Sequence, residues 1–278
     1  MKLLSNRKQI FTYATFYQEA YFTNATFSGE AYFSGQFNNE TNFNYALFES
    51  EERVFFDIEN LSCVSFMNTD LTGVRFNEKA RWGLNNKEKF KTIDERRLEE
   101  GVKREGKTKE VNLASIKALY RSLRDNYEYR MRYDESSQFF IREMELKRKY
   151  SEKESASGSQ VILNGKFTRN LSITGLYCHL FGYGENLKRI AFTTVLLFAI
   201  FSAAYFYFVS IKAASDPSHA TDRFFPFVNS TTTTLSDMFQ IKGSGLQLLD
   251  FIIRISSLPL VGIVIIALKR KFERKVRH

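Results

Sequence analysis

The sequence predicts a multidomain membrane protein, in which an N-terminal β-solenoid is followed by a helical hairpin connector and a C-terminal pair of membrane-spanning helices. Three observations predict this order. The first 80 residues repeat every five positions, the next 80 are highly charged with helical spacing, and the remainder carries two long apolar stretches. Of the net charge of +9 over 278 residues, +8 lies on residues 161–278, together with those apolar stretches. This combination favours a membrane, rather than nucleic acid, as the partner.

The first 80 residues carry a large apolar side chain at every fifth position. Phe56, Leu61, Phe66, Leu71 and Phe76 keep this step without a break, and small residues often stand two positions earlier. A period of five fits neither an α-helix nor a flat strand. A coil that turns a corner every five residues points every fifth side chain at its axis, and each coil then buries its face against its neighbours. Upstream members of the pattern are Phe11, Phe16, Phe22, Phe27, Phe33, Phe43 and Phe48, and the small residues are Ala14, Ala20, Ala25, Ala31, Thr41, Ala46 and Thr69.

Residues 10–80 resemble the pentapeptide-repeat family, and Thr69-Asp70-Leu71-Thr72-Gly73 is the best single unit. The resemblance implies a right-handed quadrilateral β-helix over residues 1–83. The repeats degrade at 36–38 and 50–55, where we expect a kinked or bulged coil. Some family members mimic DNA with a strongly acidic surface. Residues 1–80 carry 6 Lys and Arg against 10 Asp and Glu, so this segment is only weakly acidic, and we expect no nucleic-acid role.

Residues 84–160 form the predicted connector. Residues 84–111 are almost wholly charged and indicate a solvated helix or linker. Residues 112–150 have apolar side chains at helical spacing, which predicts two antiparallel helices joined by a short turn, similar to a tetratricopeptide-type hairpin. Residues 151–160 have the composition of a flexible linker. The first predicted stripe is Leu113, Ile116, Leu119, Tyr120, Leu123 and Tyr127, and the second is Phe139, Phe140, Ile141 and Met144.

Residues 161–188 mix apolar and polar side chains directly before the first apolar stretch, which predicts an interfacial amphipathic segment. Within it, Gly182-Tyr183-Gly184-Glu185 resembles a potassium selectivity filter. A filter needs a membrane helix on each side, and nothing upstream is apolar enough to span. We therefore predict no filter at this position.

Residues 189–278 are predicted to form a transmembrane pore domain. The stretch 190–211 has twenty-two residues without a charge, which is long enough as a helix for the roughly 30 Å hydrocarbon core. The second span is predicted over 247–268. It contains Asp250 and Arg254, which lie four residues apart on one helix face and can form an intramembrane ion pair.

The orientation follows from the basic residues that flank the spans. Lys188 and Arg189 precede the first span, and a basic tail follows the second, whereas the intervening loop is nearly neutral. The positive-inside rule places both termini in the cytoplasm of a multi-pass protein of the cell inner (cytoplasmic) membrane. The lipid bilayer is then the first expected partner. The basic residues of the tail are Lys269, Arg270, Lys271, Arg274, Lys275 and Arg277.

The loop between the spans carries an aromatic stretch followed by hydroxyl-bearing residues and an acid. We predict a pore loop over 223–240, with oxygens that replace water around an ion. The order of span, aromatic segment, threonine-rich turn and span resembles the two-transmembrane pore domain of tetrameric cation channels. The resemblance implies a re-entrant loop, permeant cations and a homo-oligomer, with a tetramer favoured and a pentamer possible. An extracellular lid without conduction remains the alternative for 224–239. The predicted filter residues are Thr231, Thr232, Thr233, Thr234, Ser236 and Asp237.

The expected function is therefore an oligomeric ion channel that conducts cations across the cytoplasmic membrane, with the solenoid as a cytoplasmic domain for assembly or gating. The alternative is a membrane-anchored scaffold whose solenoid recruits a cytoplasmic partner. We expect no enzyme, no catalytic residue, no cofactor and no metal site. The sequence lacks a phosphate loop and a nucleophile–His–acid arrangement, and it has only three histidines and two cysteines.

Overall fold

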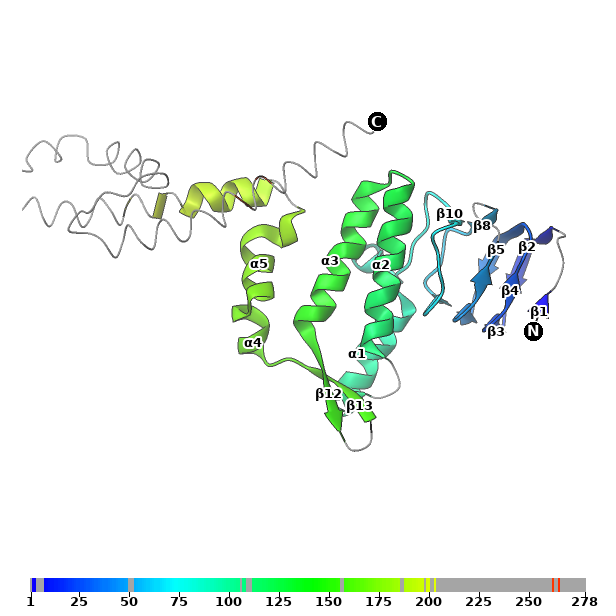
Figure 1. The fold of residues 1–278 in the computed structure, drawn as a ribbon, viewed down its shortest axis with the longest axis horizontal. Coiled ribbons are helices and arrows are strands. Elements are labelled where there is room, and N and C mark those ends of the chain that lie inside the picture. Colours follow the sequence, from blue (N-terminus) through cyan, green and yellow to red (C-terminus); the bar gives the residue numbers. More distant parts are fainter. Residues whose placement is uncertain are drawn as a thin grey trace, which may run out of the picture. The chain divides into compact units, whose positions relative to one another are not determined.

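The computed structural model of the chain describes residues 2–3, 8–49, 53–105, 107–108, 112–155, 158–185, 188–197, 199–200, 203, 262 and 265. The chain divides into two units, Met1–Gly175 and Leu176–His278. The first unit contains a β-solenoid followed by helices, as the sequence predicts (Figure 1).

The solenoid has about three turns, and its strands pair only in parallel. One ladder has four strands in the order β10-β8-β5-β2, and two further ladders have the orders β3-β6-β9 and β1-β4-β7. The predicted β-solenoid is thus confirmed. The strands are β1 (Lys2–Leu3), β2 (Gln9–Phe16), β3 (Ala20–Tyr21), β4 (Thr26–Phe27), β5 (Ala31–Phe37), β6 (Thr41–Asn42), β7 (Leu47–Phe48), β8 (Val54–Asp57), β9 (Val64–Ser65) and β10 (Val74–Phe76).

The core of the solenoid is a set of stacked phenylalanine rings. Phe33 stacks on Phe56 with ring centroids 4.6 Å apart, and Phe43 stacks on Phe22 at 4.7 Å and on Phe66 at 5.3 Å. Ala31 and Thr41, which stand two positions before Phe33 and Phe43, are fully buried beside them. Every fifth side chain therefore points at the axis, and the small residue leaves room for the ring.

The strand register explains where the five-residue step breaks. Phe56 pairs with Phe76, twenty residues later, which is four repeats without an insertion. Phe33 pairs with Phe56, twenty-three residues later, so this coil holds three extra residues. They fall after β7 and before β8, in the region where the repeats degrade.

A bulge interrupts the pairing of β2 with β5. The register shifts between Phe11 and Ala14, opposite Gly35, which has φ +124°. A Cβ on Gly35 would lie 2.2 Å from the Ala14 carbonyl oxygen, so only glycine fits here. The bulge lies in β2 opposite Gly35, whereas Gln36 and Phe37, where the sequence predicts a kinked or bulged coil, pair in regular register with Thr15 and Phe16.

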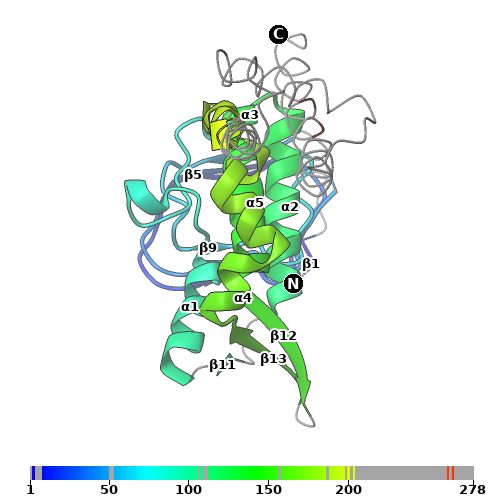
Figure 2. The same cartoon turned by 90° about the vertical axis from the view of Figure 1, so that its left-hand side faces the viewer.

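Helices close the C-terminal end of the solenoid. The turn η1 (Asn86–Glu88) leads to α1 (Ile93–Glu105), and α2 (Leu113–Tyr129) and α3 (Tyr133–Lys149) lie side by side in both views (Figures 1 and 2). Asn112 caps α2, since its side chain accepts hydrogen bonds from the backbone N–H groups of Ala114 and Ser115. The predicted hairpin and its first buried stripe are confirmed.

Two details of the connector differ from the sequence-based expectation. The charged segment 84–111 contains α1, which is packed rather than solvated, because Leu98, Asp94 and Glu95 are almost fully buried. On α3, Phe139 is buried as predicted, but the rest of the buried stripe is partly polar and includes Ser136 and Glu143. Apolar periodicity alone does not detect such a stripe.

The third difference is at residues 151–160, where the sequence indicates a flexible linker. The structure has an antiparallel hairpin of β12 (Tyr150–Ser155) and β13 (Gly158–Leu163), and β11 (Lys107–Thr108) pairs with β13. Tyr150 and Val161 are buried, which anchors the hairpin although its other residues are polar.

After the hairpin come α4 (Lys166–Leu171), α5 (Ile173–Phe181) and the turn η2 (Gly182–Gly184). Residues 188–197 are helical and begin the first predicted span. No helix within the described ranges combines the length and apolarity needed to cross a membrane. The second predicted span, apart from Gly262 and Ile265, lies outside those ranges.

Replacing a central ring of the solenoid tests this packing. Phe43 is fully buried against Phe22 and Phe66, so Phe43→Ala is expected to lower the free energy of unfolding by about 3–5 kcal/mol. Tyr17, whose side chain is 77% exposed, is the matched control, and Tyr17→Ala is expected to change it by less than about 0.5 kcal/mol. Denaturant unfolding of the full chain, followed by circular dichroism, measures both. Equal effects of the two variants would contradict the stacked core.

Candidate functional site

The junction between the last solenoid coil and the helices holds a set of buried polar and charged side chains. The last strand of the four-stranded ladder, β10, has no further strand beside it in the described chain. Side chains from α2 reach this edge instead. The Asn126 amide nitrogen donates to the carbonyl oxygens of Leu71 and Val74, the latter at 2.7 Å, and the Ser122 hydroxyl accepts from the Leu71 N–H at 3.3 Å.

Arginines satisfy further carbonyl groups of the last coils. Arg132 donates to the carbonyl oxygens of Asn77 at 3.3 Å and Glu78 at 2.8 Å, and Arg96 donates to that of Ser62. A buried carbonyl without a donor costs free energy comparable to a lost hydrogen bond. The helices therefore cover the exposed edge of the sheet and also supply its missing hydrogen-bond partners.

The aromatic stack continues from the solenoid into the helices. Trp82 contacts Phe66 and Phe76 with ring centroids 5.9 and 5.1 Å away, and its indole nitrogen donates to the Tyr127 hydroxyl at 3.1 Å. Phe139 of α3 packs edge-on against Trp82 at 5.9 Å. Burial raises the pKa of Tyr127 to about 12, so its hydroxyl stays protonated. One continuous core thus joins the two parts of this unit.

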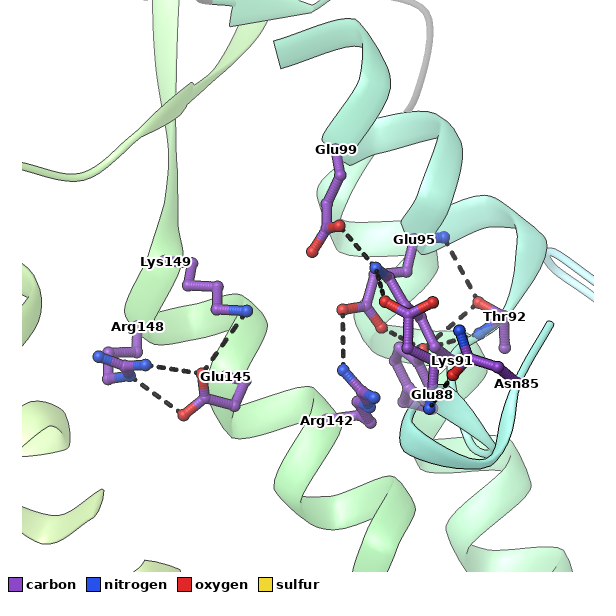
Figure 3. Close-up of polar contacts among 11 residues, drawn as sticks. Asn85, Glu88, Lys91, Thr92, Glu95, Glu99, Arg142, Glu145, Arg148 and Lys149 are labelled. Atoms are coloured by element: carbon purple, nitrogen blue, oxygen red, sulfur yellow. Dashed lines mark hydrogen bonds and ion pairs between the residues drawn. The ribbon is translucent and has the colours of Figure 1, made fainter. Parts of the chain in front are cut away.

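A buried lysine lies at the start of α1 (Figure 3). The Lys91 ammonium is 2.6 Å from a Glu99 carboxylate oxygen and 3.0 Å from one of Glu88. Burial alone would lower the pKa of Lys91, but hydrogen bonds to these two carboxylates raise it, so the lysine is charged. The pairing compensates the charge that burial would otherwise make costly.

A buried acid, Glu95, lies beside it. The Tyr120 hydroxyl donates to the Glu95 carboxylate, and Arg142 of α3 lies 3.6 Å from the other carboxylate oxygen (Figure 3). The Thr92 N–H donates to the Tyr120 oxygen at 3.1 Å. Burial raises the pKa of Tyr120 well above its usual value, and it also raises that of Glu95. This network fixes α1 against both helices of the hairpin.

A second buried acid, Asp94, faces the solenoid. One carboxylate oxygen lies 2.8 Å from the Ser65 hydroxyl, which in turn lies 2.7 Å from the Asn44 side-chain oxygen. The guanidinium of Arg97 is 3.9 Å from Asp94 and forms a closer ion pair with Glu40. Burial raises the pKa of Asp94 to about 6. Asp94 thus links α1 to two neighbouring coils.

These groups form a structural junction between α1, the helical hairpin and the solenoid. The acids and bases pair with one another, and within the described residues no set of three or more His, Cys, Asp or Glu side chains is placed to hold a metal ion. A groove of about 440 Å³ lies nearby on the outer face of β5, β8 and β10. One of its polar lining groups, the Asp57 carboxylate, accepts hydrogen bonds from the Tyr32 hydroxyl at 2.9 Å and from the Asn77 amide at 2.6 Å.

The Gly182-Tyr183-Gly184 sequence forms a tight elbow between α5 and the helix that begins at residue 188. Its three residues have φ of +55°, +60° and +81°. Tyr183 is buried and packs on Tyr177 at 5.9 Å, and a Cβ on Gly184 would lie 2.5 Å from the Tyr177 hydroxyl. The backbone turns here so that Tyr183 can fold back onto α5, which explains the two glycines without a selectivity filter.

The pore residues predicted from the sequence lie outside the described residues. These are Thr231, Thr232, Thr233, Thr234, Ser236 and Asp237, and the same holds for the proposed ion pair of Asp250 and Arg254. Conversely, sequence reasoning missed Asn126, Asp94 and Lys91. The only local signal was a polar residue at a position that helical spacing assigns to a buried stripe, as for Asn126 beside Tyr127 and Leu123.

Comparison with known proteins gives no relative: no family model, curated protein or solved structure matches the chain. The class that the fold defines is a β-solenoid closed by a helical cap.

Removing the Asn126 amide tests the junction. Asn126→Ala leaves the Leu71 and Val74 carbonyl groups without this donor, and we expect a loss of about 1–3 kcal/mol in the free energy of unfolding. The neighbouring Asp125, whose side chain is 61% exposed, provides the control, and Asp125→Ala is expected to change stability by less than about 0.5 kcal/mol. Denaturant titration of the full chain compares them. Wild-type stability in Asn126→Ala would show that the edge does not need this donor.

Proposed function

We propose that the chain is a subunit of a homo-oligomeric cation channel of the cytoplasmic membrane, with the solenoid and its helices on the cytoplasmic side. The observation that carries this proposal is the apolar surface of the helix that begins at residue 188. Phe192, Val195, Leu196 and Ile200 are between 47% and 69% exposed. These large apolar side chains cover one broad face of the helix, and such a face favours lipid, or other helices within lipid, as its surroundings.

One stripe of this helix does pack against its own unit. Ile190 and Thr193 are buried, the Thr193 hydroxyl donates to the Leu180 carbonyl at 2.6 Å, and Arg189 donates to that of His179 at 2.8 Å. These bonds satisfy carbonyl groups at the end of α5. The base of the proposed span is thereby attached to α5, directly after the elbow. Since the stretch 190–211 carries no charge, the remaining length of the segment suits a bilayer.

The proposed pore comes from the loop between the two spans. Two spans per chain cannot enclose a pore, so several copies are required, with four favoured and five possible. We propose that residues 223–240 enter the membrane as a pore loop, that Thr231–Thr234 and Ser236 offer oxygens to the ion, and that a ring of Asp237 side chains concentrates cations. The ion pair of Asp250 and Arg254 would face the interior of the assembly.

The solenoid and its cap would then serve in assembly or gating. We propose a pentapeptide-repeat type of solenoid, which is supported by the uninterrupted pairing of Phe56 with Phe76 four repeats later. The large shared core makes this unit suited to moving as one body. The elbow at Gly182–Gly184 is short and has a strained backbone, so it can transmit such a movement to the span that follows.

Planar bilayer recordings of the purified full chain test the proposal. We expect single-channel currents with cation preference, and Asp237→Asn is expected to move the reversal potential toward zero in a salt gradient, because the ring loses its charge. Asp216→Asn, in the same loop but outside residues 223–240, is the matched control and is expected to leave the reversal potential unchanged.

Two results would contradict parts of this proposal. An unchanged reversal potential in Asp237→Asn would remove the filter assignment and leave conduction in place. Absence of current in every ion gradient would favour the alternative, a membrane-anchored scaffold whose solenoid recruits a cytoplasmic partner. Imaging of the detergent-purified particles separates the two, since a channel requires ring symmetry.

A further inference from the structure

We infer that the contact between α1 and the solenoid is a pH-sensitive latch. In it, Asp94 is protonated and its carboxyl O–H donates a hydrogen bond to the Ser65 hydroxyl. This inference is independent of the proposed conduction, because it rests only on residues of the first unit. The latch is closed when Asp94 is protonated, and it loosens when the proton is lost.

The hydrogen bonds around the Ser65 hydroxyl indicate that Asp94 is protonated. The Met67 N–H donates to the Asn44 side-chain oxygen at 2.8 Å, which fixes that atom as an acceptor. The Ser65 hydroxyl lies 2.7 Å from the same oxygen, so it must give its single hydrogen to Asn44. Only a lone pair of Ser65 then faces Asp94, whose carboxyl oxygen is 2.8 Å away. The hydrogen in this last contact must come from Asp94.

The charges around Asp94 also favour its neutral form. The guanidinium of Arg97 is 3.9 Å from Asp94, but it forms its close ion pair with Glu40. One positive charge therefore faces two carboxylates. The solenoid group in direct contact with Asp94, the Ser65 hydroxyl, is neutral, and Ser65 in turn contacts the neutral Asn44 side chain. Glu40 opposes an ionised Asp94, and the N-terminal turn of α1 favours it. With one cation already paired, a neutral Asp94 leaves the junction balanced.

The burial of the Asp94 side chain favours the neutral form as well. The Asp94 side chain is fully buried, and its second carboxyl oxygen has no hydrogen-bond partner within the described structure. An ionised carboxylate in such a position would lose hydration without replacement. Burial accordingly raises the pKa of Asp94 from 3.8 to about 6, although Arg97 and the backbone N–H of Asp94 act in the opposite direction.

The direction of the pH effect follows from this shift. Between pH 3.8 and about 6 the open or unfolded state has already lost the proton that the closed state keeps. Closure is therefore most stable below this range and weakens as the pH rises through it, and it becomes constant above about pH 7. Raising the pH from 5 to 7 is expected to increase the opening equilibrium about tenfold.

Hydrogen exchange of the full chain in detergent micelles measures this opening. Peptides covering α1 (Ile93–Glu105) are compared between pH 5 and pH 8, after correction for the intrinsic exchange rate. We expect the protection of α1 to fall about tenfold from pH 5 to pH 7 and then to stay level. Peptides from β5 and β8, which do not contact Asp94, report on the solenoid itself.

Asp94→Asn separates the latch from general pH effects, since its amide can donate to Ser65 at every pH. We expect this variant to lose the tenfold change, whereas the exposed control Asp125→Asn keeps it. Constant protection of α1 in the wild type, or a tenfold change that persists in Asp94→Asn, would overturn the inference. Should Asp94→Asn fail to fold, carbon-13 NMR of aspartate-labelled wild type decides. One carboxyl that titrates near pH 6 supports the latch, and titration of every aspartate near 3.8 refutes it.

Discussion

The structure of the first unit depends on the need to satisfy the backbone at the end of a parallel β-ladder. A solenoid repeats its pairing from coil to coil, and the last coil leaves carbonyl groups without a strand to pair with. Here a helix lies over that edge and donates from side chains, so that Asn126 serves two carbonyl groups and Arg132 serves two more. The position of α2 is set by this contact. The positions of α1 and α3 follow, because both pack on α2 or on the same aromatic core.

Covering the edge in this way brings charged residues into the interior. The helix α1 is highly polar, yet Asp94 and Glu95 within it and Lys91 just before it are all buried. Each has a different compensation: an ammonium between two carboxylates, an acid held by a tyrosine and an arginine, and an acid that keeps its proton. A charged sequence thus forms a specific joint, because Lys91 and Glu95 are each paired with groups of opposite charge and Asp94 is neutral.

The part of the fold that could be predicted is the part with a local period. The five-residue spacing of Phe56, Phe66 and Phe76 predicts that they are buried. The broken spacing between Phe48 and Phe56 predicts the longer coil. The buried apolar stripe of α2 could be predicted for the same reason, since its residues recur at helical spacing. The junction has no such signal, since Asn126 and Leu71 are 55 residues apart, and only the assembled fold shows that an amide is needed there. The β12–β13 hairpin could not be predicted from the sequence, because its polar composition resembles that of a linker. The predicted pore residues, by contrast, lie outside the described chain and stay a prediction.

The distribution of extra residues along the solenoid has a consequence for how such a chain can change. The coil that ends at β10 holds four unbroken repeats, whereas the earlier coils contain additional residues and the bulge opposite Gly35. An insertion next to the helices would displace the carbonyl groups that Asn126 reaches, but one near the N-terminus only enlarges a corner. Length variation is therefore tolerated better in the two earlier coils than in the coil next to the cap. Natural diversification, or deliberate grafting of new loops, would accordingly start from those earlier coils.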